Sequence, residues 1–163
     1  VECIEDFIEP DNVDEMLPKD GIVIDCIDNV RAKAAMINTA LKRGQTIITC
    51  GAAGGRKDPL RIKIDDLALT KGDPLLSRVR ARLRKEYGFP RKNVSGKVTK
   101  FKVPAVFSDE EVLQPNEQCE LQTMGGLSCA GYGSGMVVTA SVGLAASALA
   151  LRNVAAGNKT IRI

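Results

Sequence analysis

The sequence predicts an α/β fold of one domain, residues 1–163, built around a parallel strand–helix–strand unit. Two apolar runs, residues 22–26 and 46–50, are short, continuous and rich in β-branched side chains, as buried parallel strands are. Between them, residues 30–43 carry apolar side chains at helical spacing. Such a unit is a right-handed βαβ crossover. The length of 163 residues and the hydrophobic fraction of 44% suit a single core.

The segments before this unit are short. Residues 1–8 predict a strand, and residues 13–17 predict one helical turn between the turn signals PDN and PKDG. The chain opens without Met, and we interpret it as a piece with residues missing upstream. The helix of residues 30–43 stops naturally at Gly44. Its apolar face consists of Val30, Ala34, Ile37 and Leu41.

The stretch GAAGGRKDP follows the second strand directly. We expect a loop at the carboxyl edge of the sheet, where α/β proteins bind ligands. It is neither of the common glycine-rich phosphate loops, so a plain flexible connection remains an alternative. Residues 60–64 and 103–107 predict further strands.

A second helix begins at Asp73 and Pro74, a good cap and a good first residue, and ends at Gly88. Its apolar positions form a narrow stripe of Leu75, Leu76, Val79 and Leu83. The stretch FPRKNVSGKVTK behind it predicts a basic loop or hairpin.

Charge is distributed unevenly along the chain, although the net charge is only +3. The first twenty residues hold eight acidic side chains and one Lys, whereas residues 78–102 hold ten basic side chains and one acidic one, Glu86. This asymmetry predicts an acidic face and a basic arm, residues 77–102.

The sequence excludes several kinds of site. It has no His, so Ser or Cys triads with a His base are excluded. Its five Cys form no CxxC pair, which makes a zinc site a poor interpretation and favours a reduced, cytoplasmic protein over a disulfide scaffold. We interpret Cys26 and Cys50, at the ends of the two core strands, as packing residues.

No charged residue occurs between positions 125 and 151, so a membrane span has to be considered. The segment is rich in Gly, Ser, Thr and Ala, and we favour a core or subunit-interface helix that runs to Arg152. Small residues at intervals of four would let another helix approach closely, namely Gly135, Thr139, Gly143 and Ser147.

Four stretches together resemble one family. They are VIDCIDNVRAKAAMIN, TIITCGAAGGRKDPLRIKIDDLALTKGDPL, VFSDEEVLQP and SCAGYGSGMVVTASVG. They are similar to the carboxyl-terminal part of ThiF/MoeB/HesA-type proteins, the ubiquitin-activating-like adenylating enzymes. The resemblance is greatest to the tRNA threonylcarbamoyladenosine dehydratase branch and covers about residues 7–151.

The resemblance implies the back half of a Rossmann-like fold: the parallel unit, an antiparallel strand extension and a C-terminal interface helix. It implies an enzyme that uses ATP and Mg²⁺ to adenylate the threonylcarbamoyl carboxylate of tRNA, which then cyclises with loss of water. It also implies a homodimer. The family's GxGGVG-like nucleotide loop is absent from these residues, so we expect this part alone to be inactive.

Carried over from the family, Asp28 is the acid that holds Mg²⁺ and serves catalysis, with Asn29 and Lys33 beside it at the nucleotide. Desolvation of an acid at a strand end is then offset by the metal. The alternatives are that Asp28 only caps the following helix and that Lys33 is a solvated charge. Asp25, which ends the strand, would orient its neighbours by hydrogen bonding.

Two further features follow from the resemblance. Cys129 matches a Cys of the branch and is a candidate catalytic nucleophile or sulfur carrier, with a small buried residue as the alternative. The basic arm would bind tRNA phosphates, with a solvated helix face as the alternative. Its candidate residues are Arg78, Arg80, Arg82, Arg84, Lys85, Arg91 and Lys92.

Two other functions stay open. An adenylating enzyme for a ubiquitin-like sulfur-carrier protein would need a sulfur-transfer partner and usually carries CxxC pairs. A non-catalytic dimerisation and RNA-binding module would bind tRNA without releasing pyrophosphate.

Overall fold

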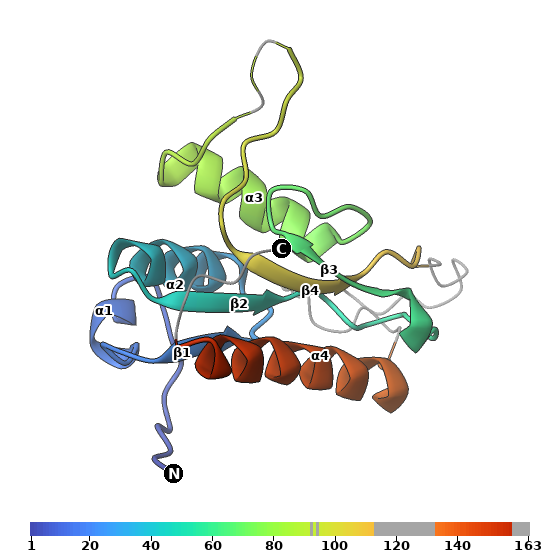
Figure 1. Cartoon of the computed structure of the whole chain (residues 1–163), viewed down its shortest axis with the longest axis horizontal. Coiled ribbons are helices and arrows are strands. Elements are labelled where there is room, and N and C mark those ends of the chain that lie inside the picture. The colour runs from blue at the N-terminus through green and yellow to red at the C-terminus, as the bar shows by residue number, and fades with distance from the viewer. Residues whose placement is uncertain (92, 94, 113–132, 158–163) are drawn as a thin grey trace, which may run out of the picture.

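The computed structural model describes residues 1–91, 93, 95–112 and 133–157. A four-stranded sheet lies at its centre, with strand order β1-β2-β4-β3 (Figure 1). Strands β1 (Ile22–Asp25), β2 (Thr46–Cys50) and β4 (Pro104–Ser108) are parallel to one another, whereas β3 (Ile62–Asp66) is antiparallel to β4. The predicted parallel unit and antiparallel extension are both confirmed.

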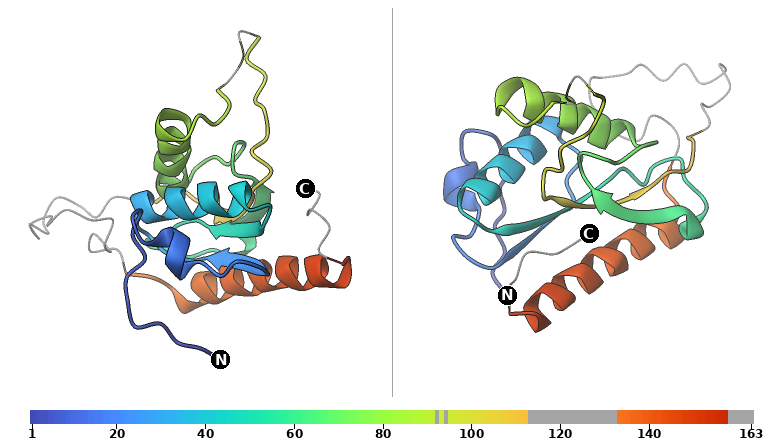
Figure 2. Two further views of the ribbon diagram at one scale, coloured as in Figure 1. Left: turned by 90° about the vertical axis from the view of Figure 1, so that its left-hand side faces the viewer. Right: turned by 45° about the horizontal axis from the view of Figure 1, so that its top comes forward.

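Helices cover both faces of this sheet (Figure 2). Helices α1 (Val13–Met16), α2 (Val30–Lys42) and α3 (Pro74–Glu86) lie on one face, and α4 (Met136–Ala155) lies on the other. Each face has its own apolar core. The larger core joins α2, α3 and the sheet, and the smaller one joins α4 to β1, β2 and β4.

Local signals in the sequence explain the two central helices. In α2, Ala34 and Ile37 of the predicted apolar face are buried, while Val30 and Leu41 at its ends are half-buried. In α3, the predicted stripe is fully buried, and the Asp73 carboxylate caps the helix by accepting a hydrogen bond from the Leu76 amide at 2.8 Å. Pro74 occupies the first turn as expected.

Three expectations were wrong. Residues 1–8 form no strand. The strand expected at residues 60–64 begins at Ile62, because Asp58 and Pro59 set up a short 3₁₀ turn, Pro59–Arg61. Strand β1 is only partly buried, with Ile24 40% exposed, since β1 is one of the two outer strands of the described sheet.

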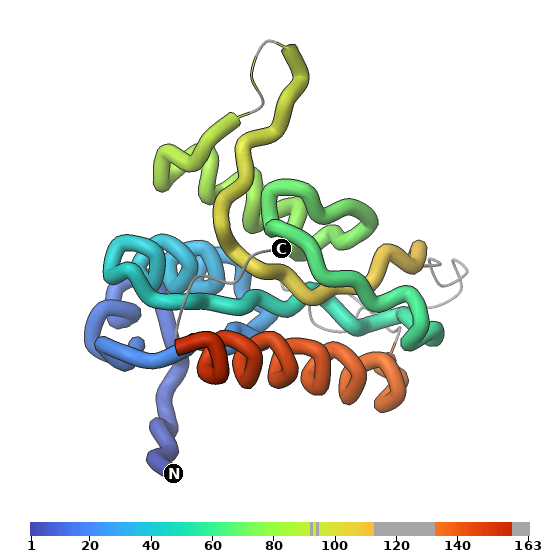
Figure 3. Tube along the Cα trace, viewed as in Figure 1, coloured from blue at the N-terminus to red at the C-terminus, as the bar shows by residue number. Residues whose placement is uncertain are grey.

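The basic arm consists of two parts. Residues 77–86 belong to α3, and the chain from Phe89 to Lys100 projects away from the sheet as a long loop, with no strand among its described residues (Figure 3). A tight turn closes it, with the Gly96 amide donating to the Asn93 carbonyl at 2.9 Å.

One described helix, α4, is long and apolar enough to cross a membrane, with a mean hydropathy of 1.5. One side of it packs on the sheet through Val138, Val142, Ala146 and Leu149. The helix by itself therefore does not indicate a membrane protein. The row of small residues is not the packed side: Thr139 and Ser147 are exposed, and their hydroxyls donate to carbonyls of the preceding turn.

Candidate functional site

The candidate site lies at the carboxyl edge of the parallel strands. Strands β1, β2 and β4 all run the same way, so the residues after Asp25, Cys50 and Ser108 meet at one edge of the sheet. This is the edge at which open α/β sheets bind ligands. It carries the loop of residues 26–29 and the glycine-rich loop of residues 51–58.

Asp28 is an exposed residue of the first loop. Within the described part of the chain, its carboxylate makes no hydrogen bond or ion pair. It does not cap α2. The cap is Asn29, whose Oδ1 accepts hydrogen bonds from the amides of Arg31 at 2.9 Å and Ala32 at 3.1 Å. The capping alternative for Asp28 is thus wrong, and its carboxylate is accessible to a ligand.

Lys33 lies below this edge and is fully buried. Its ammonium donates hydrogen bonds to Asp25 Oδ2 at 2.7 Å and to Thr49 Oγ1 at 3.2 Å. The Thr49 hydroxyl donates to the same carboxylate oxygen at 2.7 Å. A solvated Lys33 is therefore wrong. Asp25 orients its neighbours as expected, and it also accepts a hydrogen bond from the Ile27 amide at 3.2 Å through Oδ1.

The buried trio Asp25, Lys33 and Thr49 fixes the ends of β1 and β2 in register with α2. Charges that are this deeply buried persist only when they are paired and hydrogen-bonded. The sequence contained a signal for this contact. Lys33 is followed by a run of apolar residues, Ala34, Ala35, Met36 and Ile37, so a helical position among buried neighbours was already indicated.

The glycine-rich loop is built around the Asp73 carboxylate. Asp73 Oδ2 accepts a hydrogen bond from the Ala52 amide at 2.9 Å. A Cβ atom at Gly51 would lie 2.3 Å from that oxygen and 3.0 Å from the Cβ of Phe107, so only glycine fits there. Gly55 adopts a φ of +73°, which also favours glycine.

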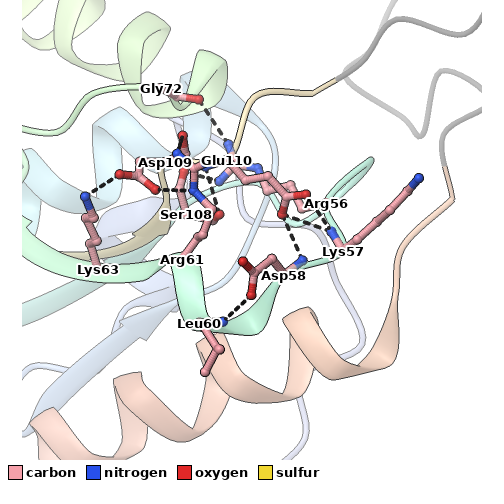
Figure 4. A network of polar contacts seen from close by, with 10 residues as sticks. All are labelled: Arg56, Lys57, Asp58, Leu60, Arg61, Lys63, Gly72, Ser108, Asp109 and Glu110. Atoms are coloured by element: carbon pink, nitrogen blue, oxygen red, sulfur yellow. Dashed lines mark hydrogen bonds and ion pairs between the residues drawn. The ribbon is translucent and has the colours of Figure 1, made fainter.

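Arg56 holds the same loop from inside. Its guanidinium is buried and pairs with Asp73, with Nη2 3.2 Å from Oδ2. The same nitrogen donates to the Gly72 carbonyl at 3.3 Å, and Nη1 donates to the Ser108 carbonyl (Figure 4). Sequence reasoning missed Arg56, because its partners come from α3 and from the end of β4.

Glu110 closes the loop from the outside. Its carboxylate accepts hydrogen bonds from the backbone amides of Lys57 and Asp58, each at 3.0 Å to Oε2 (Figure 4). These bonds hold the pKa of Glu110 below its ordinary value of 4.5. The neighbouring Asp109 contacts Lys63 and Arg61, which lower its pKa as well. The loop is thus anchored at several points, which argues against the alternative of a plain flexible connection.

The predicted tRNA-binding residues separate into two groups. Arg78, Lys85 and Arg91 are exposed. Three others make internal contacts, as the helical faces of α3 dictate. Arg80 donates to Thr70, Arg82 pairs with Glu86 at 2.7 Å, and Arg84 donates to the Pro90 carbonyl at 3.1 Å.

Two of these arginines contact other segments of the chain through their guanidinium groups. Burial lowers the pKa of Arg80, and the Arg84 guanidinium lies 5.2 Å above the ring of Phe101. Lys92 and Cys129, the remaining candidates, lie outside the described residues.

The carboxyl edge of the sheet suits Mg²⁺ only if a bound substrate supplies some of the oxygen atoms that coordinate the ion. Among the described residues there is no group of three or more carboxylate or thiol side chains that could hold a metal. Mg²⁺ commonly binds through one or two carboxylates together with substrate phosphates. The exposed carboxylate of Asp28 fits that pattern, and no described all-protein site competes with it.

The sheet, its helical layers and this polar edge define a partial Rossmann-like α/β fold. No protein-family model matches the chain. Curated relatives do match. The chain is 39% identical over 145 residues to the tRNA threonylcarbamoyladenosine dehydratase of Haemophilus influenzae, which covers 88% of this chain and 54% of that protein. It is 38% identical over 165 residues to that of Escherichia coli, which covers 96% of this chain and 60% of that protein.

Solved structures agree with these relatives. A crystal structure of the E. coli tRNA N6-threonylcarbamoyladenosine dehydratase matches 94% of this chain with a TM-score of 0.75 and 36% identity. The same enzyme in complex with ATP matches with a TM-score of 0.74. This chain is therefore a homologue of the tRNA threonylcarbamoyladenosine dehydratases. It spans about half the length of the relatives it matches.

Proposed function

We propose that the protein containing this chain is an ATP-dependent dehydratase that modifies tRNA, and that this chain supplies the carboxyl edge of its nucleotide site. One observation carries the proposal. An ATP complex of a relative shares this fold over 94% of the chain at 36% identity. The substrate is the threonylcarbamoyl group of a modified adenosine in tRNA.

The reaction has two steps. A carboxylate oxygen of the threonylcarbamoyl group attacks the α-phosphorus of ATP, and pyrophosphate leaves. The activated acyl group is then attacked from within the same side chain, which closes a ring and releases AMP. The net change in the tRNA is the loss of one water.

The residues of this chain would act in the first step. Asp28 would hold Mg²⁺ at the edge, and a bound ion would supply positive charge beside the phosphates of the nucleotide. The amino end of α2 follows at once and favours an anion through its dipole. Lys33 is buried beneath this edge, and its ammonium is paired with the Asp25 carboxylate. We therefore propose that Lys33 holds the ends of β1 and β2 in place and does not contact phosphate directly.

We propose three further properties on the same basis. Arg78, Lys85 and Arg91 form the exposed part of a tRNA-binding surface on α3 and the arm. The exposed apolar side of α4 is a homodimer interface, and the protein acts in the cytoplasm. Catalysis by Cys129 and a sulfur-transfer partner remain proposals without a described contact.

A substrate-dependent assay tests the proposed reaction. The full-length protein is mixed with ATP and Mg²⁺, and pyrophosphate release is measured with threonylcarbamoyl-modified tRNA and with the same tRNA lacking the modification. We expect release only with the modified tRNA. Release that needs a ubiquitin-like carrier protein instead would identify the sulfur-carrier function, and tRNA binding without any release would identify a binding module.

A further inference from the structure

Two cysteines lie side by side at the carboxyl edge of the sheet. Cys26 follows β1, and Cys50 ends β2. The Cys26 thiol points at Cys50, with 3.7 Å between the two Sγ atoms. Both thiols are free, Cys26 in an exposed residue and Cys50 in a buried one. The expectation that both are packing residues is therefore wrong for Cys26.

The backbone allows a covalent bond between them. The register pairs Asp25 with Thr49, so Cys26 and Cys50 are the next residues along two neighbouring parallel strands. Neighbouring strands lie about 4.8 Å apart, and disulfides form across Cα separations of about 4.4–6.8 Å. The two sulfurs would need to approach from 3.7 Å to about 2.05 Å, a movement that side-chain rotation and the unpaired backbone after β1 can absorb.

We propose that Cys26 and Cys50 form a reversible intramolecular disulfide when the protein meets a low-molecular-weight disulfide such as oxidised glutathione. The exposed Cys26 thiolate attacks one sulfur of the small disulfide, forms a mixed disulfide and expels one thiolate. Cys50 then loses its proton and attacks Cys26 Sγ, expelling the second thiolate. Two protein thiols are oxidised, and one small disulfide is reduced to two thiols.

The environment sets the order and speed of these steps. Burial, together with the neighbouring Cys26, raises the pKa of Cys50 to about 12, so Cys50 is a protonated thiol at neutral pH. The exposed Cys26 hence reacts with the small disulfide first, and the later attack by Cys50, which closes the ring, is the slow step. Conversion of Cys26 to a mixed disulfide removes the part of this raised pKa that comes from the Cys26 thiol, while burial, the largest cause, remains. The bond would tie the loop that carries Asp28 to the glycine-rich loop.

Peptide mapping tests the proposal. The folded full-length protein is incubated with oxidised glutathione at pH 8, free thiols are alkylated under denaturing conditions, and the protein is digested with trypsin. The sequence places the two cysteines in separate peptides, residues 20–31 and 44–56. We expect these peptides joined, with two hydrogens fewer than their sum, and separated again after dithiothreitol.

Matched variants make the result decisive. Cys3→Ser removes an exposed thiol elsewhere and should leave the cross-link unchanged. Cys26→Ser should abolish the cross-link and leave Cys50 reduced, because Cys50 is buried. The proposal fails if Cys26 retains glutathione with no cross-link, if both thiols remain alkylatable, or if the cross-link involves another cysteine.

Discussion

Lys33 shows at the scale of one residue how this edge is held. Its ammonium is buried against Asp25 and Thr49, so neither charge of the pair is solvated. Removing one member leaves the other buried without compensation, which costs about 3–5 kcal/mol. Replacing both members with uncharged residues of similar shape recovers much of the lost stability.

We predict that Lys33→Met lowers the free energy of unfolding by about 3–5 kcal/mol in urea titrations. The double variant Asp25→Asn with Lys33→Met should recover more than half of the loss. Lys42→Met, an exposed lysine of the same helix, is the control and should change stability by about 0.5 kcal/mol or less. An equal effect of the two lysine substitutions would contradict the assignment.

Glu110 ties stability to pH. Its pKa is lowered in the folded state because its carboxylate accepts hydrogen bonds from the backbone amides of Asp58 and Lys57. A lowered folded-state pKa means that the group stabilises the fold above its ordinary value of 4.5 and loses that effect as pH falls through the folded value. Asp109 acts in the same direction through Lys63 and Arg61.

We predict that Glu110→Gln lowers the melting temperature at pH 7 and that the difference from the unmodified protein shrinks below pH 4. Thermal unfolding followed by circular dichroism across this range measures it. Glu111→Gln, which alters an exposed neighbour, is the matched control. A difference that stays constant from pH 7 to pH 3 would disprove the role given to these amide contacts.

At the scale of the element, α3 divides its basic residues between two tasks. Arg80 and Arg84 bind Thr70, the Pro90 carbonyl and the Phe101 ring, and thereby attach the helix to the segments around it. Arg78 and Lys85 lie exposed on another side, and Arg91 extends that charge into the arm. We therefore propose that the second group, rather than Arg80 and Arg84, meets a phosphate backbone.

We predict that Arg78→Gln, Lys85→Gln and Arg91→Gln together weaken tRNA binding of the full-length protein roughly tenfold at low salt and flatten its salt dependence. Arg80→Gln with Arg84→Gln should reduce thermal stability more than tRNA affinity. Filter binding at several salt concentrations measures both effects. Loss of binding confined to the Arg80 and Arg84 variant would reverse the assignment.

Helix α4 has a second apolar side that the sheet does not cover. Val137, Leu144 and Leu151 are exposed at intervals of seven, which places them on one side of the helix. Leu144 is 71% exposed, although a buried leucine contributes about 2 kcal/mol. This side is the candidate dimer interface.

We predict that Leu144→Asp converts a dimer of the full-length protein into a monomer while circular dichroism stays unchanged. Leu60→Asp is the control, because Leu60 is an even more exposed leucine, at 91%, on a different element. Sedimentation equilibrium distinguishes the two states. A dimer that survives Leu144→Asp would place the interface elsewhere.

At the scale of the whole molecule, the sequence predicted the features that depend on neighbouring residues in the chain, namely the strands and the helix starts. Apolar runs defined the parallel strands, and Asp73 with Pro74 defined the start of α3. It could not predict contacts between distant elements, such as Arg56 with Asp73 or Glu110 with the glycine-rich loop. It also misjudged residues 1–8, which pair with no strand among the described residues.

The most direct test is pyrophosphate release by full-length Asp28→Ala with modified tRNA. A carboxylate that holds Mg²⁺ acts mainly as the bond to pyrophosphate breaks, so we expect the rate to fall at least a hundredfold, about 2.7 kcal/mol, with the fold intact. Asp14→Ala, which removes an exposed acid of α1 that pairs with Arg43, should retain the original rate. An Asp28→Ala protein that turns over as fast as the unmodified one would contradict the proposed site.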